Sequence, residues 1–325
     1  MWGIRAARLF DGERFVDRPT VLVDDGEVVA VGEPVPESAP VVELGEDTLL
    51  PGFVDCHQHL VFDGHGTLEG QVSGIADDVL VERARTAARR ALSGGVTTLR
   101  DLGDRGFLTL GLRGDRHLPT VAAAGPPITP PGGHCWYLGG ETEGEPALRQ
   151  AVAERIERGC DVVKIMVTGG AMTPSFPLWQ NQFTRPEVQL VVDEAHRSGR
   201  PVAAHCHGID GISLAIDVGV DSIEHCSFFT DALECAPPPE LLERLAASDV
   251  AVSATWGLTA EPARPPHWDV AFPLIRAASG EVHRAGGHVV VGTDAGIYPQ
   301  KPHDVLPHSL PTMLEAGMST VDALR

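Results

Sequence analysis

The sequence predicts an α/β protein, a (β/α)8 or TIM barrel preceded by a small β-domain. From Gly52 onward, short apolar segments alternate eight times with amphipathic stretches, whereas residues 1–50 hold only short strand-like segments and turns. Apolar strands that alternate with helices form a parallel sheet covered by those helices, and eight such units close a barrel. An open doubly wound sheet is the alternative, but no Gly-x-Gly-x-x-Gly turn follows the first strand.

The first predicted domain spans residues 1–50 and is a small β-domain. Asp11-Gly12 and Asp25-Gly26 are typical of two-residue hairpin turns. The expected strands are Gly3–Leu9, Thr20–Val23, Glu27–Val31 and Val41–Leu44. Strands this few and short make a poor core alone, so we expect them to pack on other structure.

The second predicted domain spans residues 51–325 and contains the barrel. Its expected strands are Phe53–Cys56, Val96–Leu99, Thr120–Ala123, Val162–Met166, Val202–Ala204, Ser222–Glu224, Ala251–Ala254 and Val289–Gly292. The expected helices cover about residues 77–92, 105–114, 146–158, 186–198, 209–217, 239–247, 270–285 and 304–316. Thr184-Arg185-Pro186-Glu187 fits a capping box with an early proline.

Composition limits the possible partners. The 325 residues are 43% hydrophobic and 22% charged, which is ordinary for a globular protein. The net charge of −20 argues against nucleic acid and against an anionic membrane as partners. No apolar run reaches the length of a membrane span, and the first residues lack the apolar core of a signal peptide. Six cysteines without a Cys-x-x-Cys pair fit a reducing compartment, so we expect a cytoplasmic protein.

Lys164 and Lys301 are the only lysines, because arginine carries almost all of the basic charge. A buried lysine can lose its proton and react as an amine, which arginine cannot do. Codon preference for arginine is the ordinary explanation of the ratio. That preference makes an exception inside an apolar strand, at Lys164, a stronger candidate for amine chemistry.

Imidazole, carboxylate or lysine side chains lie at the ends of five of the eight expected strands. Barrel active sites lie at the carboxyl ends of strands, so these side chains are expected to converge. Each has an ordinary explanation alone: a chance His-x-His pair, a buried core histidine, a helix N-cap or a snorkelling lysine. Their coincidence on separate strands instead predicts a catalytic metal site. The side chains at these strand ends are those of His57, His59, Lys164, His205, His207, Glu224, His225 and Asp294.

The order His-x-His, Lys, His, His, Asp on these strands resembles the amidohydrolase superfamily, and in detail its prolidase-like (Xaa-Pro dipeptidase-related) branch. The resemblance covers most of the chain. Its matching stretches are Pro51–His59, Gly95–Gly103, Gly132–His134, Val162–Gly170, Glu194–Gly208, Val220–His225 and Gly292–Gly296.

The resemblance implies a binuclear metal centre. Lys164 would be carbamylated by CO2 and would bridge two divalent metal ions. Zinc is the expected metal, and manganese, cobalt or iron also fit nitrogen and oxygen ligands. A metal-bridging hydroxide would attack the substrate carbonyl, with Asp294 as general base and then general acid. The remaining ligands would be His57 and His59 with Asp294 for one ion, and His205 and His225 for the other.

The substrate contacts rest on the same resemblance. In the Gly132-Gly133-His134 loop, His134 would hold a carbonyl or carboxylate of the substrate and so take part in catalysis. A turn in which Trp136 and Tyr137 simply pack is the alternative. Arg100, at the end of the second strand, either braces the site or binds substrate. The candidate substrate contacts are His134, Tyr137, His207 and Arg100.

The predicted activity is hydrolysis of the amide C–N bond in a dipeptide or an N-acyl amino acid, which makes the partner a small-molecule substrate. Ring opening of a cyclic amide, as in imidazolonepropionase-like enzymes or in lactam and imide hydrolases, is the alternative within the same chemistry. A phosphotriesterase-like hydrolase and a degenerate barrel without catalytic activity are two further alternatives.

The end of the chain departs from the resemblance. The family returns after the eighth helix to add strands to the N-terminal β-region, whereas this chain ends at Arg325 inside an expected helix, 319–325. The β-domain is therefore expected to be an incomplete β-sandwich that lacks its usual C-terminal strands and has an open edge. Either the chain has been shortened, or a natural short form covers that edge as a homo-oligomer.

Overall fold

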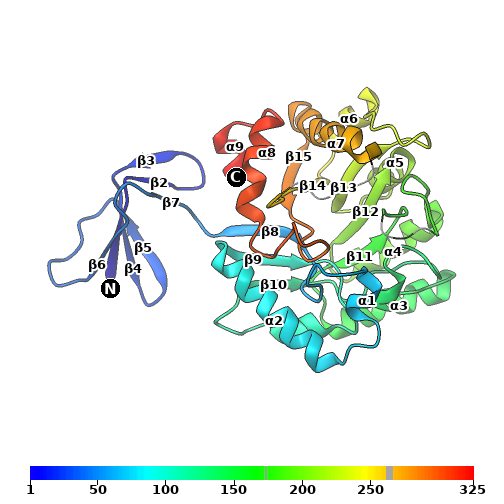
Figure 1. Cartoon of the computed structure of the whole chain (residues 1–325), viewed down its shortest axis with the longest axis horizontal. Helices are drawn as coiled ribbons and strands as arrows, with labels where there is room; N and C mark the ends of the chain where they lie inside the picture. Colours follow the sequence, from blue (N-terminus) through cyan, green and yellow to red (C-terminus); the bar gives the residue numbers. More distant parts are fainter. Residues whose placement is uncertain (172, 174, 261–265) are drawn as a thin grey trace. The chain divides into compact units, whose positions relative to one another are not determined.

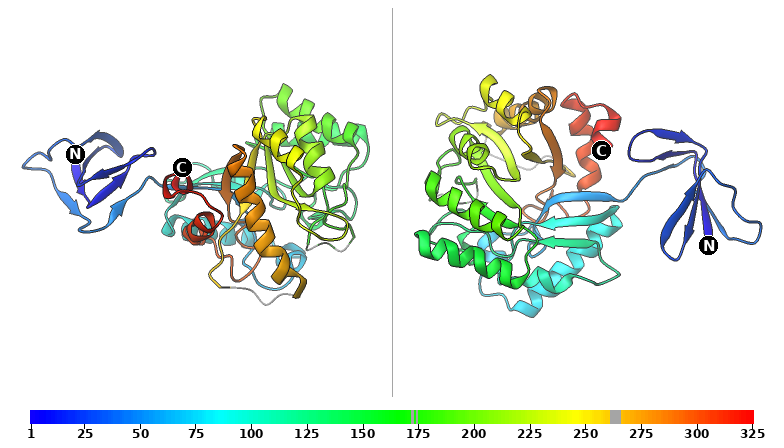
Figure 2. Two further views of the ribbon diagram at one scale, coloured as in Figure 1. Left: turned by 90° about the horizontal axis from the view of Figure 1, so that it is seen from above. Right: turned by 180° about the vertical axis from the view of Figure 1, so that it is seen from behind.

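The computed structural model of the chain describes residues 1–171, 173, 175–260 and 266–325. They form two compact units. One consists of Met1–Gly52 together with Ser319–Arg325, and the other is Phe53–Met318. Each unit can be followed by itself in the two views of Figure 2.

The first unit contains two small sheets, which are drawn in blue in Figure 1. One has the strand order β5-β4-β1-β6 and the other β3-β2-β7. Asp25 and Gly26 have φ of 47° and 83°, as a two-residue hairpin turn between β4 and β5 requires. The elements are β1 (Trp2–Arg5), β2 (Arg8–Phe10), β3 (Phe15–Asp17), β4 (Thr20–Asp24), β5 (Glu27–Val31), β6 (Val41–Glu43), β7 (Thr48–Leu49) and α9 (Thr320–Leu324).

The expectations for this unit are met in part. The strand expected over Gly3–Leu9 is two strands, β1 and β2, which belong to different sheets. Strands β3 and β7 have only three and two residues, too short to give an alternating pattern, and were not expected. Leu9, Val21 and Val23 form a small buried cluster. So few buried side chains agree with the expectation that this unit has a poor core of its own.

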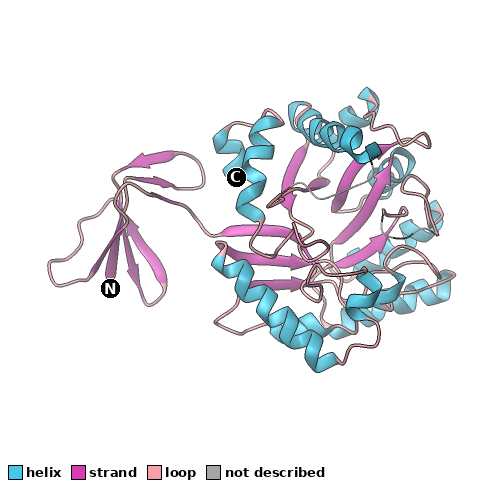
Figure 3. Ribbon diagram, in the orientation of Figure 1, coloured by secondary structure: helices cyan, strands magenta, loops and turns pink. Residues whose placement is uncertain are grey.

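The second unit contains eight parallel strands among the described residues, and helices lie outside them (Figures 1 and 3). They form two sheets, β10-β9-β8 and β11-β12-β13-β14-β15. In addition to these strand pairings, single parallel bridges join Gln58 to Ala295 and Ile128 to Ile165. The strands are β8 (Phe53–Gln58), β9 (Val96–Asp101), β10 (Thr120–Ala123), β11 (Val163–Met166), β12 (Val202–Gly208), β13 (Ser222–Phe229), β14 (Ala251–Thr255) and β15 (His288–Gly292). The prediction of an α/β protein with parallel strands is confirmed.

Helices follow most of these strands. The capping box of Thr184 and Glu187 begins α4, and Gly159 ends α3 with φ of 82°. The helices are α1 (Leu68–Val72), α2 (Asp77–Ser93), α3 (Glu145–Arg158), α4 (Arg185–Arg197), α5 (Ile209–Val218), α6 (Pro239–Ala246), α7 (Pro266–Arg284) and α8 (Ser309–Glu315), with short 3-10 helices at Leu108–Leu112, Trp136–Leu138 and Leu306–His308. None of these described helices combines the length and the apolar character that crossing a membrane demands.

The prediction of an α-helix over 105–114 is wrong. This segment contains only the 3-10 helix Leu108–Leu112, which Phe107 precedes in a left-handed conformation with φ of 64°. Gly106, Gly111 and Gly114 supply backbone freedom that favours turns over an α-helix. The expected helix over 304–316 is likewise divided between a 3-10 turn and α8.

The main hydrophobic core lies between the strands and their covering helices. Val163 and Ile165 of β11 belong to a buried cluster that also contains Val188 and Val192 of α4. Lys164 lies between Val163 and Ile165 in β11 and is equally buried, at 1% exposure. Because successive residues of a strand face opposite ways, its side chain faces away from the helix layer.

Candidate metal centre

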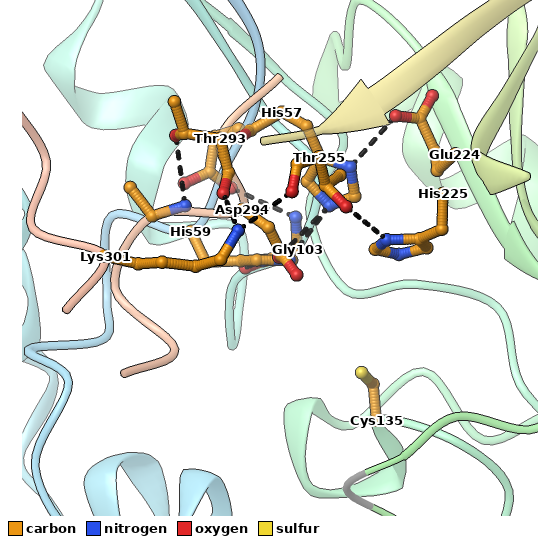
Figure 4. A network of polar contacts seen from close by, with 12 residues as sticks. His57, His59, Gly103, Cys135, Glu224, His225, Thr255, Thr293, Asp294 and Lys301 are labelled. Carbon is orange, nitrogen blue, oxygen red and sulfur yellow. Dashed lines mark hydrogen bonds and ion pairs between the residues drawn. The ribbon is translucent and has the colours of Figure 1, made fainter. Parts of the chain in front are cut away.

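His57 and His59 leave the end of β8 on the same side and meet Asp294, which follows β15. The two Nε2 atoms are 3.2 Å apart, and Asp294 Oδ1 lies 3.5 Å from His57 Nε2 and 3.3 Å from His59 Nε2. Figure 4 shows the three side chains pointing toward one another. Two imidazoles and a carboxylate at this spacing are a donor set for a divalent transition metal.

A second group is formed by His205, His207 and His225. One ligand atom from each lies within 4.8 Å of the others. The His205 and His225 ring centroids are 4.6 Å apart, and His207 stacks on His225 at 4.7 Å. The ring of His225 is also 5.2 Å from that of His57, so the two groups are neighbours. His207, which was expected as a substrate contact, is thus a member of this group together with the two expected ligands, His205 and His225.

Four of the histidines use their second ring nitrogen in hydrogen bonds. His57 Nδ1 is 2.9 Å from Glu224 Oε2, and His59 Nδ1 is 3.0 Å from the Gly103 carbonyl oxygen. His205 Nε2 lies 3.1 Å from the carbonyl oxygen of Gly169, and His225 Nδ1 lies 2.9 Å from Thr255 Oγ1. Such contacts fix the ring orientation and the tautomer of metal-binding histidines. The other ring nitrogen of each is then available as a ligand.

His225 and Asp294 reach the site because their backbone is left-handed, with φ of 70° and 56°. The side chain of the preceding residue, Glu224, already lies on the inner face of the sheet, where it contacts His57. Regular strand alternation would turn His225 to the opposite face. The positive φ turns it back, at a strain that non-glycine residues bear mainly at functional sites.

Lys164 is the one site residue whose polar atom has no hydrogen-bond partner among the described residues. Burial lowers the pKa of its amine to about 8, against an opposing influence from Glu224. A buried amine without a partner calls for an explanation. Conversion to a carbamate would turn a cation that repels metal ions into an anion with two oxygen donors, so the residues present fit a carbamate between two ions.

His57, His205, His225 and Asp294 are in the protonation states that divalent cations need. Burial lowers the pKa of His57 to about 4, and it also holds the pKa values of His205 and His225 well below their ordinary value. Burial alone would raise the pKa of Asp294, but His57 and His59 beside it lower this pKa below its usual range. Neutral imidazoles next to an ionised carboxylate are the forms that bind divalent metals.

A cavity of about 880 Å³ opens onto this site. His134 and His207 line it, as do all six expected ligands. His134 shares a hydrogen bond of 3.0 Å with Thr173 Oγ1 through its Nδ1, which orients its ring. The remaining lining is largely apolar and includes Phe229, Trp256, Leu258, Phe272, Ile275 and Ile297.

Two expected substrate contacts are not among the described residues that line this cavity. Tyr137 is buried, with its hydroxyl 3.7 Å from Cys135 Sγ. Arg100 donates to the Cys56 carbonyl oxygen and to Glu224 Oε1, both at 2.7 Å. The bracing alternative for Arg100 and the packing alternative for Tyr137 therefore agree with their contacts.

Sequence reasoning assigned no role at the site to Glu224 or to Lys301. Glu224 stands directly before His225, and a carboxylate beside a strand-end histidine is a usable signal. Lys301 is the second lysine of an arginine-rich chain, so the scarcity that singled out Lys164 applies to it as well. It is buried, and its Nζ donates to the carbonyl oxygens of Thr255 at 3.0 Å and Thr293 at 2.6 Å, which ties the ends of β14 and β15 together (Figure 4).

The fold and the two ligand groups define an α/β protein with a candidate metal centre at the carboxyl ends of parallel strands. Residues 48–325 match the amidohydrolase family, and the chain belongs to that family. The resemblance drawn from the sequence is thereby confirmed, as is the prediction of an amidohydrolase at the level of the family.

Known proteins agree with this assignment. The chain is 32% identical over 213 residues to ochratoxinase of Aspergillus niger, which covers 55% of this chain and 43% of that protein. It is 25% identical over 244 residues to imidazolonepropionase of Salinispora tropica, and this match covers 65% of this chain and 58% of that protein. The chain thus spans about half the length of these relatives. A crystal structure of a Xaa-Pro dipeptidase superposes with a TM-score of 0.84 at 25% identity, covering 99% of this chain and 85% of the other.

Proposed function

We propose that this chain is a binuclear-metal amidohydrolase that hydrolyses the amide C–N bond of a dipeptide or an N-acyl amino acid. The observation that carries the proposal is the pair of ligand groups that line one cavity with the buried amine of Lys164, which has no hydrogen-bond partner among the described residues. The family, and the likeness to a Xaa-Pro dipeptidase, support the same class of reaction.

The proposed ligands come from the two groups, with His205 and His225 chosen from the second group by the resemblance to the family. His57, His59 and Asp294 would hold one ion, His205 and His225 would hold the other, and a carbamate on Lys164 would offer an oxygen to each. Zinc is the first candidate, with manganese, cobalt and iron as the other candidates. Bound divalent ions supply an acidified water and polarise a carbonyl oxygen.

Two of the chain's own residues transfer the proton and hold the substrate. Asp294 takes a proton from the attacking water and delivers it to the leaving nitrogen, for which its carboxylate must be ionised beforehand. Its lowered pKa keeps the carboxylate ionised before the reaction. His134 holds a carbonyl or carboxylate of the substrate, and the hydrogen bond to Thr173 supports this by fixing its ring.

A metal-loaded activity screen tests the proposal. Dipeptides and N-acyl amino acids are expected to be hydrolysed only after the protein is loaded with a divalent metal. Turnover of phosphotriesters alone would favour a phosphotriesterase-like hydrolase. A protein that binds no divalent metal and turns over none of these compounds would be a non-catalytic barrel.

Ring opening of a cyclic amide is the second candidate, favoured by the similarity to imidazolonepropionase. The same metal ions and Asp294 would serve, because the ring amide also needs a polarised carbonyl and a protonated leaving nitrogen. Adding lactams and imides to the screen separates the two candidates.

The apolar lining of the cavity favours substrates with a large apolar group. Ile275 of α7 lines the cavity, whereas Leu274 is 43% exposed. In Ile275→Ala, we expect kcat/KM for an N-octanoyl amino acid to fall by about 10-fold, since lost apolar contact of this size is worth about 1–3 kcal/mol. N-acetyl substrates should change little. Leu274→Ala is the control, and equal losses in both variants would contradict the expectation.

Metal affinity should rise with pH up to about pH 8. Burial lowers the pKa of His59, but Asp294 outweighs burial and raises this pKa above its ordinary value, whereas burial lowers the pKa of Lys164 to about 8. Both groups must lose protons when metal binds, so the affinity rises by up to about tenfold per pH unit for each proton released. Zinc titration calorimetry in two buffers of different ionisation enthalpy counts these protons. An affinity that is flat over this range would contradict the proposed ligands.

The remaining expectations stay predictions. We propose that the two parallel sheets close into a single (β/α)8 barrel, which the bridges at Gln58 and Ile128 support. The domain division into residues 1–50 and 51–325 and a cytoplasmic location are proposed on the sequence arguments alone.

A further inference from the structure

We propose that Glu224 and Arg100 form a positioning pair that holds the ring proton of His57 on Nδ1 and so directs its Nε2 lone pair at the metal site. The inference rests on the proposed function for its purpose, since a metal ion needs that lone pair. Neither Glu224 nor Arg100 belongs to the two ligand groups or to the described residues that line the cavity.

The Glu224 carboxylate is fully buried and has a donor at each oxygen. Oε1 accepts from Arg100 Nη2 and from Ser222 Oγ, both at 2.7 Å. Oε2 accepts from His57 Nδ1 at 2.9 Å, a contact drawn in Figure 4. With the Arg100 guanidinium and two further donors around it, the carboxylate is ionised and accepts hydrogen bonds only.

An acceptor at Nδ1 determines the tautomer of a neutral imidazole. His57 must place its proton on Nδ1 in order to donate to Oε2, and Nε2 then carries the lone pair. That Nε2 faces Asp294 Oδ1 at 3.5 Å and His59 Nε2 at 3.2 Å. The tautomer that Glu224 selects is thus the one that can bind a metal within the first ligand group.

Arg100 fixes the orientation of the carboxylate. Its Nε donates to the Cys56 carbonyl oxygen at 2.7 Å, one residue before His57 on β8. Its Nη1 lies 3.1 Å from Ser222 Oγ on β13. Side chains from β8, β9 and β13 are therefore locked to one another, and the strand that carries Glu224 also carries His225 of the second group.

The variant Glu224→Gln gives a sharp test because Arg100 dictates how the new amide must lie. The guanidinium requires an acceptor, so the amide oxygen faces Arg100 and the amide nitrogen faces His57 Nδ1. His57 must then accept at Nδ1 and carry its proton on Nε2. We expect metal affinity to fall by about 10- to 100-fold, as for other residues that orient a metal-binding histidine.

The double variant Arg100→Met with Glu224→Gln separates positioning from simple packing. Without the guanidinium the amide can turn its oxygen to His57 Nδ1, so metal affinity should recover most of the loss. Glu243→Gln, an exposed position on α6, is the matched control and should bind metal as the wild type does. If the double variant binds metal as weakly as Glu224→Gln, the pair does not act through the tautomer and the proposal is overturned.

Nitrogen-15 NMR of metal-free protein reads the tautomer directly, and zinc titration calorimetry reads the affinity. We expect Nδ1–H at His57 in the wild type and Nε2–H in Glu224→Gln. An Nε2–H tautomer in the wild type overturns the proposal without any variant, as does wild-type affinity in Glu224→Gln. A wild type with the Nδ1–H tautomer that binds no metal would instead overturn the proposed function and leave the positioning of His57 intact.

Discussion

Replacing Asp294 by asparagine is expected to lower kcat for amide hydrolysis by about 10²- to 10⁴-fold, the range by which general acid–base groups contribute. Asparagine keeps the shape and one oxygen donor but can neither take a proton from water nor deliver one to the leaving nitrogen. The effect should therefore fall on kcat more than on KM. Steady-state kinetics of metal-loaded protein with the best substrate from the screen measures it.

The metal content of Asp294→Asn must be measured beside its kinetics, because Asp294 is also a proposed ligand. A variant that retains both ions and has lost turnover identifies the proton-transfer role. Asp304→Asn, at a partly exposed acid that pairs with Arg90, is the control for an aspartate change in the same region. Unchanged turnover in Asp294→Asn would sink the mechanism.

Replacing Lys164 by methionine is expected to abolish binding of at least one of the two metal ions without destabilising the metal-free protein. The side chain is 1% exposed, and its amine has no hydrogen-bond partner among the described residues. Methionine fills a similar volume and removes a buried polar group, which costs free energy when it lacks a partner. Metal analysis after gel filtration and thermal unfolding of metal-free protein give the two readouts.

Lys164→Arg is the matched control because it keeps the positive charge but cannot be carbamylated. It should lose metal binding as the methionine variant does. Metal uptake by the wild type should also depend on added bicarbonate, whereas uptake by either variant should not. Two ions bound by Lys164→Met would show that no carbamate bridge is needed.

Residue pattern was sufficient for the eight parallel strands of the second unit and for the convergence of their end residues, but not for the short strands β3 and β7. Both follow from short-range rules: apolar runs of strand length, alternation along a strand, and the common direction of parallel strands. His57 and His59 meet because they are two apart on one strand. The failure at 105–114 has an equally local cause, since Phe107 is left-handed and the three glycines of this segment disfavour an α-helix.

Contacts between strands were beyond the sequence. Nothing in the order of residues tells that Arg100 of β9 reaches Glu224 of β13, or that Glu224 reaches His57 of β8. The left-handed conformation of His225 is also a tertiary effect. A Glu-His dipeptide in a strand predicts opposite faces, and only the surrounding structure can hold both side chains inward.

The Glu224-His225 dipeptide makes the first half of β13 intolerant of insertions and deletions. Glu224 and His225 serve different groups from adjacent positions, and the backbone is left-handed at His225 and at the next residue, Cys226, with φ of 70° and 49°. A one-residue shift would move both side chains to the wrong face at once, and no substitution at either position could restore them. Across related sequences, variation in length should therefore collect in the loop after Phe229 and be absent between Ser222 and His225.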